Sequence, residues 1–303
     1  MRAVLDCDPG QDDAVALAVA AHRCELVGVV SVAGNVGLAH TTTNTLALAQ
    51  LLELEAPVHA GASGPLVGET VDASSVHGAS GLAGAVLPPI TRSVASEDGA
   101  GFLVDSSLAH DDLWVIATGP LTNVALAIQR DPGFAARLAG ITIMGGGTVG
   151  NATAAAEFNI YADPEAAEIV LESGARLLMC GLDVTRQLHV TQAMVDEVAA
   201  LPNTFGPFCA GFLQAYLDRV RDLTGASGEA ALHDPCAVLA LTDPDLLESS
   251  TRRVLVECAG RHTRGMTLVD QRPWARGGNV EWFETIDAER ATRLVIEAIA
   301  AAS

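Results

Sequence analysis

The sequence predicts an α/β protein with a single doubly wound, mostly parallel sheet flanked by helices, and three observations support this fold class. Short apolar runs, several of them rich in β-branched residues, alternate along the chain with longer segments of helical periodicity. Polar clusters follow the ends of the expected strands, which is where ligands bind in open α/β sheets. No linker, charge block or repeat divides the chain, so we expect one domain over residues 1–303.

The first part of the chain contains two strand–helix units followed by a long irregular segment. The nearly continuous apolar run LVGVVSV over residues 26–32 is typical of a strand that is buried on both faces. Residues 61–90 are rich in Gly and Pro and show no clear element, and segments of this length without secondary structure are often active-site lids. The other elements expected here are a strand over 3–8, a helix over 12–22 and a helix over about 38–53.

The alternation of strands and helices resumes after this segment. Asp163 and Pro164 end a second long loop, over 145–162, and begin a helix as its N-cap residue and its first-turn proline. The other elements expected are strands over 113–117, 141–144, 176–180, 252–258 and 263–269, a turn at 118–123 with a helix to about residue 130, and helices over about 192–223, 234–241 and 287–301.

The charge balance and composition exclude several classes of function. Seventeen basic residues against 37 acidic ones give a net charge of −20, whereas a nucleic-acid polymer or an anionic membrane surface needs a cationic face. No apolar run reaches the roughly 18 residues of a membrane span, and no export signal follows Met1. All basic residues are arginine, which excludes a lysine-dependent phosphate loop. The six cysteines form no C-x-x-C pair, so we expect reduced thiols in a cytoplasmic protein.

Four carboxylates lie within eight residues around the first strand-to-helix turn: Asp6, Asp8, Asp12 and Asp13. Helix capping explains one or two of them, but Asp6 and Asp8 precede the turn and point to the same side of a strand. Anions at such close range repel each other unless a cation lies between them. Because ligands that are all oxygen favour Ca²⁺ or Mg²⁺ over zinc, the turn predicts a divalent-cation site.

A second acidic position lies far downstream, where His233 and Asp234 precede an apolar helix. Taken alone, Asp234 followed by Pro235 is more simply interpreted as a helix N-cap. A histidine beside a potential metal ligand is nevertheless well placed to donate a proton near neutral pH. Both interpretations therefore remain open for this pair.

A third polar cluster surrounds Phe158 in the second long loop. Asn151, Glu157 and Asn159 offer two amides and a carboxylate, which can donate to and accept from several hydroxyl groups. An aromatic ring among them can pack on an apolar face of the same ligand. The cluster therefore suits a polyhydroxylated ligand better than an ordinary surface loop does.

The segment Asp6-Cys-Asp-Pro-Gly-Gln-Asp-Asp-Ala14 resembles the amino-terminal signature of the inosine–uridine-preferring nucleoside hydrolases. Further motifs of that family follow in the family's order over essentially the whole chain, which is far more specific than any single motif. Cys7 replaces a threonine that is common in the family, and the neighbouring acids are intact. The further motifs are Gly34-Asn35, His77-Gly78, Thr118-Gly-Pro-Leu-Thr-Asn123, Met144-Gly-Gly146, Asn151, Glu157-Phe-Asn159, Asp163-Pro-Glu165 and His233-Asp-Pro235.

The resemblance implies an enzyme that hydrolyses the N-glycosidic bond of purine or pyrimidine ribonucleosides to ribose and free base. It implies a Ca²⁺ ion held by the carboxylates of Asp8, Asp13 and Asp234 and the main-chain carbonyl of Thr118. In this family pattern Asp8 is also the general base that activates a calcium-bound water, and His233 matches a position proposed as the leaving-group acid in one subgroup. The residues implied in substrate binding are Asp12, Asn35, His77, Met144, Asn151, Glu157, Phe158 and Asn159.

Members of this family commonly form homodimers or homotetramers and serve nucleoside salvage, so both are expected here, but the sequence does not choose between the two assemblies. It also does not indicate which bases are accepted. Tyr216, Arg219 and Arg221 are candidates for closing over the base, and ordinary helix surface explains them equally well.

Other function classes compete with this interpretation. Residues 145–150 match the G-x-G-x-x-G dinucleotide fingerprint, but the next helix is expected only at Asp163, too late to meet a pyrophosphate. The pair Asp6-x-Asp8 also occurs in aspartyl-nucleophile phosphatases, although Pro9-Gly10 replaces their usual continuation. A nucleoside-binding protein without turnover would be expected to lack Asp8 or a metal ligand, and all of these are present.

Overall fold

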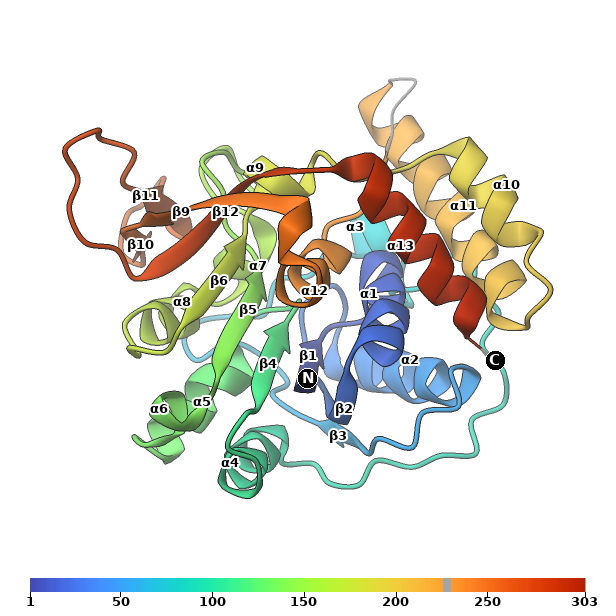
Figure 1. Ribbon diagram of the computed structural model, residues 1–303, viewed down its shortest axis with the longest axis horizontal. Helices are drawn as coiled ribbons and strands as arrows, with labels where there is room; N and C mark the ends of the chain where they lie inside the picture. Colours follow the sequence, from blue (N-terminus) through green and yellow to red (C-terminus); the bar gives the residue numbers. More distant parts are fainter. Residues whose placement is uncertain (226–229, 303) are drawn as a thin grey trace.

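The computed structural model describes residues 1–225 and 230–302, and it has the predicted α/β fold with a mostly parallel sheet (Figure 1). Within the described residues, eight strands form this sheet; the first seven run parallel and the last is antiparallel. Across the sheet they are β3 (Val58–Ala60), β2 (Glu25–Ser31), β1 (Arg2–Cys7), β4 (Trp114–Ala117), β5 (Gly140–Met144), β6 (Leu177–Cys180), β12 (Val280–Ile286) and β9 (Leu247–Arg252).

Helices pack against both faces of this sheet, as a doubly wound fold requires. One core contains residues of α1 (Gln11–Arg23), α2 (Leu38–Leu51), α10 (Gln192–Ala199), α11 (Phe205–Thr224), α12 (Pro235–Thr242) and α13 (Ala288–Ala301). The other contains residues of α4 (Gly99–Ala109), α5 (Thr122–Arg130), α6 (Phe134–Arg137) and α8 (Pro164–Leu171).

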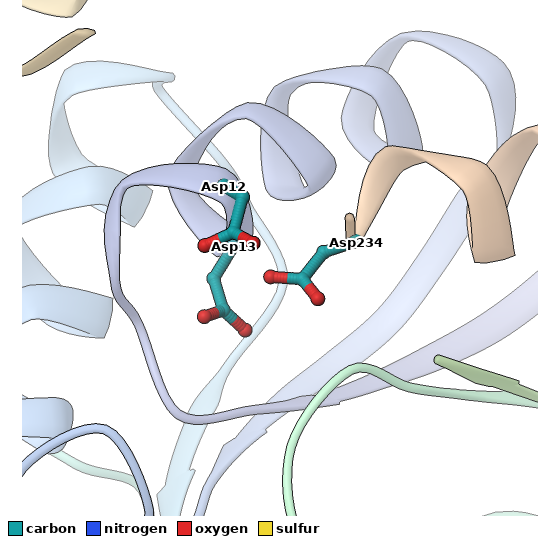
Figure 2. Close-up of side chains that lie close together, drawn as sticks. All are labelled: Asp12, Asp13 and Asp234. Carbon is teal, nitrogen blue, oxygen red and sulfur yellow. The ribbon is translucent and has the colours of Figure 1, made fainter. Parts of the chain in front are cut away.

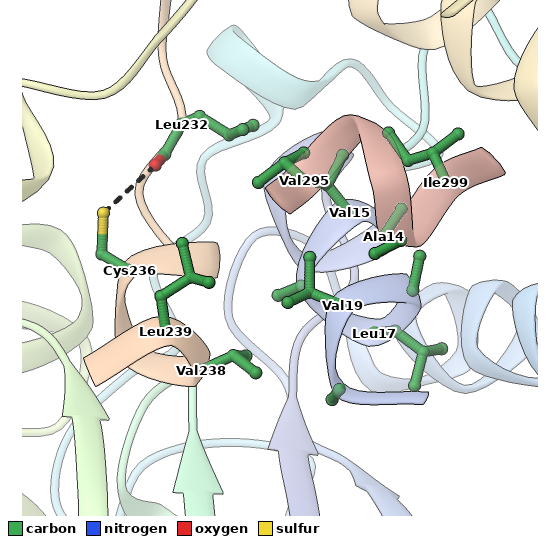
Figure 3. Packing of buried hydrophobic residues seen from close by; sticks show 14 of the residues in the cluster. Ala14, Val15, Leu17, Val19, Leu232, Cys236, Val238, Leu239, Val295 and Ile299 are labelled. Carbon is green, nitrogen blue, oxygen red and sulfur yellow. Dashed lines mark hydrogen bonds between the residues drawn. The ribbon is translucent and has the colours of Figure 1, made fainter. Parts of the chain in front are cut away.

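Successive residues of β1 enter these two cores alternately, because side chains of a strand point to opposite faces. Ala3 and Leu5 belong to the first core and Val4 to the second. In the first core, α1 packs between α12 and α13, and Figure 3 shows this apolar contact. Packing of α1 against α12 holds the beginnings of two helices near each other although they are distant in the sequence.

Each of the two long loops contains a short helix. Helix α3 (Ser74–His77) lies in the first loop, and α7 (Phe158–Ala162) lies in the second. No helix within residues 1–225 and 230–302 is both long and apolar enough to cross a membrane. The remaining elements are α9 (Leu182–Thr185), a 3₁₀ turn over Pro244–Leu246, and two small antiparallel pairs, β7 (His189–Val190) with β8 (Ala230–Ala231) and β10 (Val254–Glu257) with β11 (Met266–Val269).

The helical region predicted over 192–223 is observed, but it consists of two helices, α10 and α11, with a break between them. Pro202 separates α10 from α11, because proline lacks a backbone N–H and disfavours helical geometry in the residue before it. Asn203 then accepts a hydrogen bond from the Gly206 amide at 2.8 Å and supports the new helix start.

The late strands are arranged differently from the sequence prediction. The stretch 252–258 spans the end of β9 and all of β10, and β10 pairs with β11 in a separate hairpin instead of the main sheet. The sequence did not predict several short elements of two to five residues, of which β3 is one, or two longer ones, α4 and β12. Strand β3 has only three residues, α4 begins with glycines, and β12 carries acidic residues, so none of them shows a clear apolar period.

Candidate active site

A cavity of about 330 Å³ lies beyond the carboxyl ends of the central strands. It is lined by all eight side chains predicted to bind substrate, and also by Thr118, His233 and Asp234. Its volume is within the range of small-molecule sites. Asp8 and Asp13 are not among the lining residues and are almost completely buried. The residues that line it without having been predicted from sequence are Val71, Asp72, Ala73, Ser75, Val76, Ala152 and Tyr161.

Three carboxylates lie close together (Figure 2), and two of them, Asp12 and Asp234, line the cavity. Asp12 and Asp13 lie in the first turn of α1, and Asp234 lies immediately before α12. One oxygen from each lies within 4.8 Å of the others, which is a suitable spacing for ligands of one metal ion. Asp234 is the N-cap residue of α12 by position, but within the described residues its side chain makes no capping hydrogen bond, so it is free to face the other acids.

The electrostatics of the cluster favour a cation. Burial raises the pKa of Asp12 and Asp13 to about 6, and burial together with the neighbouring carboxylates raises the pKa of Asp8 and Asp234 further. The Oδ1 atoms of Asp8 and Asp12 are buried and have no hydrogen-bond partner within the described residues. Buried carboxylate oxygens without donors are costly unless a cation neutralises them, so these residues fit a hard divalent ion.

Asp8 and Asp13 are oriented by hydrogen bonds from the surrounding turns. Asp8 Oδ2 accepts from the Asn35 amide at 2.6 Å, and Asp13 accepts from the Gly10 amide at 3.0 Å and from Asn35 Nδ2 at 3.1 Å. A Cβ atom at Gly34 would lie 2.1 Å from Asp8 Oδ2, so only glycine fits beside this carboxylate. One oxygen of Asp8 is therefore fixed, while the other has no donor among the residues that the structure describes.

Asp6 lies outside the cavity, although the sequence groups it with the other acids. Its Oδ1 accepts from Asn123 Nδ2 at 2.7 Å, and burial raises its pKa to about 7. Asn123 also donates to the Ser31 carbonyl, which ties β1 to the neighbouring β2. Asp6 thus joins β1 to β2 and to the turn after β4.

The second long loop is folded around Glu157. This carboxylate caps α7 by accepting from the amides of Asn159 and Ile160, and it accepts from the Gly146 amide at 2.8 Å. Burial raises its pKa to about 7. The helix N-terminus in this loop is thus already occupied by a carboxylate of the chain, and the glycines at 145–150 do not open a helix. This geometry does not support the dinucleotide alternative.

Asn159 connects two strand ends. Its Nδ2 atom donates to the carbonyls of Thr118, at 2.7 Å, and Met144, at 3.1 Å, which leaves its Oδ1 for another partner. Asn151 Oδ1 accepts from the Phe158 amide at 2.9 Å. The polar cluster predicted around Phe158 is thus held together by its own hydrogen bonds and faces the cavity.

His233 stands beside the acidic cluster, and its orientation depends on a residue that the sequence analysis missed. Its Nδ1 atom lies 2.8 Å from Thr185 Oγ1 on α9. Burial is the main cause that lowers the pKa of His233 to about 3, so its imidazole is neutral at pH 7. Thr185 carries no sequence signal for this role, because a threonine in a short helix is usually only a structural residue.

The three candidates for closing over the base, Tyr216, Arg219 and Arg221, lie in different positions relative to the cavity. The Tyr216 ring lines the cavity parallel to His77, with 6.1 Å between ring centroids. Arg219 Nε donates to the Ser75 carbonyl at 2.7 Å and so attaches α11 to the first long loop. Arg221 pairs with Asp218 on the same helix and does not line the cavity.

Comparisons with known proteins agree with this geometry. A family model described as inosine-uridine preferring nucleoside hydrolase matches residues 3–293. The pyrimidine-specific ribonucleoside hydrolase RihA of Salmonella typhimurium is 40% identical over 274 residues, which cover 88% of each chain. The solved structure of a purine-preferring ribonucleoside hydrolase from Gardnerella vaginalis has a TM-score of 0.93 and 30% identity, covering 99% of this chain and 98% of that one. A plant nucleoside hydrolase has a TM-score of 0.90 and 31% identity, covering 99% of both chains.

Proposed function

The chain belongs to the inosine-uridine preferring nucleoside hydrolase family and is an enzyme of that kind, and on this premise we propose that it hydrolyses ribonucleosides with Asp8 as general base at a Ca²⁺ site. The reaction breaks the bond between C1′ and the base nitrogen and forms a bond from C1′ to a water oxygen. One proton leaves the water and one reaches the departing base. The observation that carries the proposal is the buried carboxylate cluster at the cavity, with the unpartnered Oδ1 of Asp8.

The residues that would hold Ca²⁺ are Asp8, Asp13, Asp234 and the Thr118 carbonyl. When bound, the ion would orient the ribose hydroxyls and the attacking water and offset the negative charge of the carboxylates. Asp12 lies in the same cluster as Asp13 and Asp234, so it borders the metal site as well as the substrate. Carboxylate and carbonyl oxygens are the ligands that Ca²⁺ prefers.

Asp8 is suited to accept the proton of the attacking water. Its Oδ2 is fixed by the Asn35 amide, so Oδ1 is the atom available for the proton. Asp8 must be ionised to act as a base, and a cation bound beside it would favour the ionised form. A positioned base of this kind contributes on the order of 10²- to 10⁴-fold to the rate.

The leaving base is stabilised from the opposite side of the reaction centre, and His233 is the candidate hydrogen-bond donor. If Thr185 donates its hydroxyl hydrogen to Nδ1, the single proton of the neutral imidazole lies on Nε2 and can hydrogen-bond to the departing base. Full transfer of a proton needs the imidazolium form, which is scarce at pH 7 because burial lowers the pKa of His233 to about 3. Glycosidic cleavage passes through an oxocarbenium-like centre that benefits from both an activated water and a protonated leaving group. Asp8 would activate the water, and His233 would assist the departing base through a hydrogen bond from Nε2.

The remaining cavity residues would hold the nucleoside. Asn159 Oδ1 and Asn35 offer hydrogen bonds to ribose, while Met144 and Phe158 supply apolar contact. Asp12, His77, Asn151 and Glu157 complete the lining. Relatives with pyrimidine-specific and purine-preferring names match this chain, so we propose both base classes as substrates. Nucleoside salvage in the cytoplasm by a homodimer or homotetramer stays a prediction.

A reducing-sugar assay with inosine and uridine tests the function directly. We expect ribose release that a calcium chelator abolishes and that added Ca²⁺ restores. The same assay with 2′-deoxyinosine should show a loss of at least tenfold, because a missing hydroxyl leaves the site's polar partners unpaired. Tight nucleoside binding without ribose release would refute the enzymatic proposal. Equal turnover of inosine and 2′-deoxyinosine would refute the proposal that the site binds the ribose 2′-hydroxyl.

A further inference from the structure

Gln11 is a buried amide that neither the metal site nor the proposed catalytic roles use. It is the first residue of α1 and is fully shielded from solvent. Its Nε2 atom donates to the carbonyls of His77, at 3.3 Å, and Ala83, at 3.5 Å. Its Oε1 atom lies 2.7 Å from His77 Nδ1. A single side chain thus contacts both the backbone and the imidazole of His77 in the first long loop.

These contacts determine which end of the amide faces the imidazole. Two carbonyl oxygens surround one end of Gln11, and they can only accept hydrogen bonds, so the amide nitrogen must be at that end. The amide oxygen therefore faces His77 Nδ1, and an amide oxygen also only accepts. It follows that Nδ1 of His77 carries a proton.

The other ring nitrogen of His77 is consequently an acceptor. Burial lowers the pKa of His77 to about 4, so at pH 7 the ring is neutral and has one N–H, which is at Nδ1. His77 lines the cavity, and Nε2 has no hydrogen-bond partner within residues 1–225 and 230–302. The hydroxyl of the adjacent Tyr216 cannot provide one, because it donates to the Ala231 carbonyl at 2.9 Å.

Neighbouring residues also restrict the orientation of the His77 imidazole. Its plane is within 11° of the Tyr216 ring. On the side of the acidic turn, a Cβ atom at Gly10 would lie 2.5 Å from His77 Nδ1, so the imidazole occupies the space that the glycine leaves. Rotation of the ring would break the hydrogen bond to Gln11.

We propose that Gln11 is a positioning residue that holds His77 as a hydrogen-bond acceptor, so that Nε2 selects nucleosides that present a donor group to this wall of the cavity. The inference deepens the proposed function and rests on it. A nucleoside has two kinds of donor that fit, the 5′-hydroxyl of the ribose and a ring N–H of the base. Loss of one neutral hydrogen bond changes kcat/KM by about 5- to 10-fold.

The test compares inosine with 5′-deoxyinosine and 1-methylinosine, each of which lacks one donor, using the calcium-loaded enzyme. The readout is the ratio of kcat/KM for inosine to kcat/KM for each analogue. In H77N, the shorter amide places nothing at the Nε2 position, so one ratio should fall about 5- to 10-fold. In H77Q, the longer amide can present its oxygen there, so the same ratio should be retained. The ratio that falls identifies the donor as the 5′-hydroxyl or the ring N–H.

The role of Gln11 is tested by Q11M, which keeps the length of the side chain and removes both polar ends. We expect the ratio that falls in H77N to fall in Q11M as well, and the double variant to match H77N because both changes remove one interaction. A merely structural role would lower all rates together and leave the ratios unchanged.

The possible outcomes separate this inference from the proposed function. Unchanged ratios for both analogues in H77N, or in Q11M, would overturn the positioning role. If the unaltered enzyme released no ribose from inosine or uridine, the proposed function itself would fail. Thermal melting of each variant identifies any that does not fold, and H77N and Q11M each test the inference alone.

Discussion

The acidic turn at the start of α1 and the segment around α3 (residues 71–83), called the lid segment because the sequence predicts a lid there, form two walls of the same cavity but are held in different ways. Asp8, Asp12 and Asp13 in the turn are buried, and hydrogen bonds from Gly10 in the turn and from Asn35 and Thr118 at neighbouring strand ends orient Asp8 and Asp13. The lid segment is exposed at Asp72 and Ser75 and is attached by a few hydrogen bonds from other elements.

The difference between the walls suggests a division of function. The turn concentrates like charges at a rigid site, where a metal ion and a general base need fixed geometry. The lid segment has fewer buried contacts, and such regions open at lower free energy than the core. Changes in the turn should therefore affect the chemical step and metal-dependent stability, and changes in the lid should mainly affect substrate binding.

The largest expected effect comes from Asp8. D8N should lower kcat by at least 10³-fold, because it removes the base and a proposed metal ligand together. Asp6, two residues earlier on β1, provides a matched control. It is equally buried, and neither carboxylate lines the cavity, but Asp6 accepts a hydrogen bond from Asn123 and is not one of the proposed metal ligands. D6N should lower kcat less than tenfold in the ribose-release assay, and similar losses for D6N and D8N would contradict the role of Asp8.

The second largest effect should be a loss of thermal stability when the metal is removed. Ca²⁺ at 100 times its Kd is worth about 2.7 kcal/mol, which for a chain of this size corresponds to a rise in Tm of about 5 °C. D234N removes one of the repelling carboxylates, so in chelator it should melt at a higher temperature than the unaltered protein. Adding Ca²⁺ should raise the Tm of D234N much less than it raises the Tm of the unaltered protein. A D234N protein that gains as much from Ca²⁺ as the unaltered one would exclude Asp234 as a ligand.

The acidic turn could be predicted from the sequence because its carboxylates lie close together along the chain. Asp8 and Asp13 lie at a strand-to-helix turn, and the order of strands predicts that this turn reaches the ligand-binding edge. The partner Asp234 was ambiguous on residue type alone, since a carboxylate before Pro235 fits a helix cap as well as a metal ligand. Only the packing of α1 against α12 brings these acids together.

The lid and the supporting residues were much less predictable. Gln11 and Thr185 orient the two histidines of the cavity, but glutamine and threonine occur in helices without any such role. Tyr161 enters the cavity because α7 forms within a segment that the sequence suggested only as a loop. The direction of a side chain in an irregular segment depends on long-range packing, which apolar periodicity does not encode.

The stability of the metal-free protein should depend on pH through the acidic turn. Folding raises the pKa of Asp12 and Asp13 from about 4 to about 6, so the folded state binds more protons than the unfolded state in this interval. Stability should therefore fall as pH rises from about 4 to 6. Urea unfolding in chelator at pH 4.5 and 7 measures this. D234N should show a smaller fall, and a metal-free protein that is more stable at pH 7 would contradict the electrostatic account.

The smallest effect is expected where the two walls are joined. Asn44 Nδ2 donates to the Pro9 carbonyl in the acidic turn at 3.0 Å and to the Ser80 carbonyl in the lid segment at 2.8 Å. N44A removes both bonds without touching a carboxylate, so KM should rise about three- to tenfold while kcat stays within twofold of its original value. T43A, which loses only a bond within α2, is the matched control. If N44A lowered kcat and left KM unchanged, the lid would contribute to the chemical step, and the separation between the two walls would not hold.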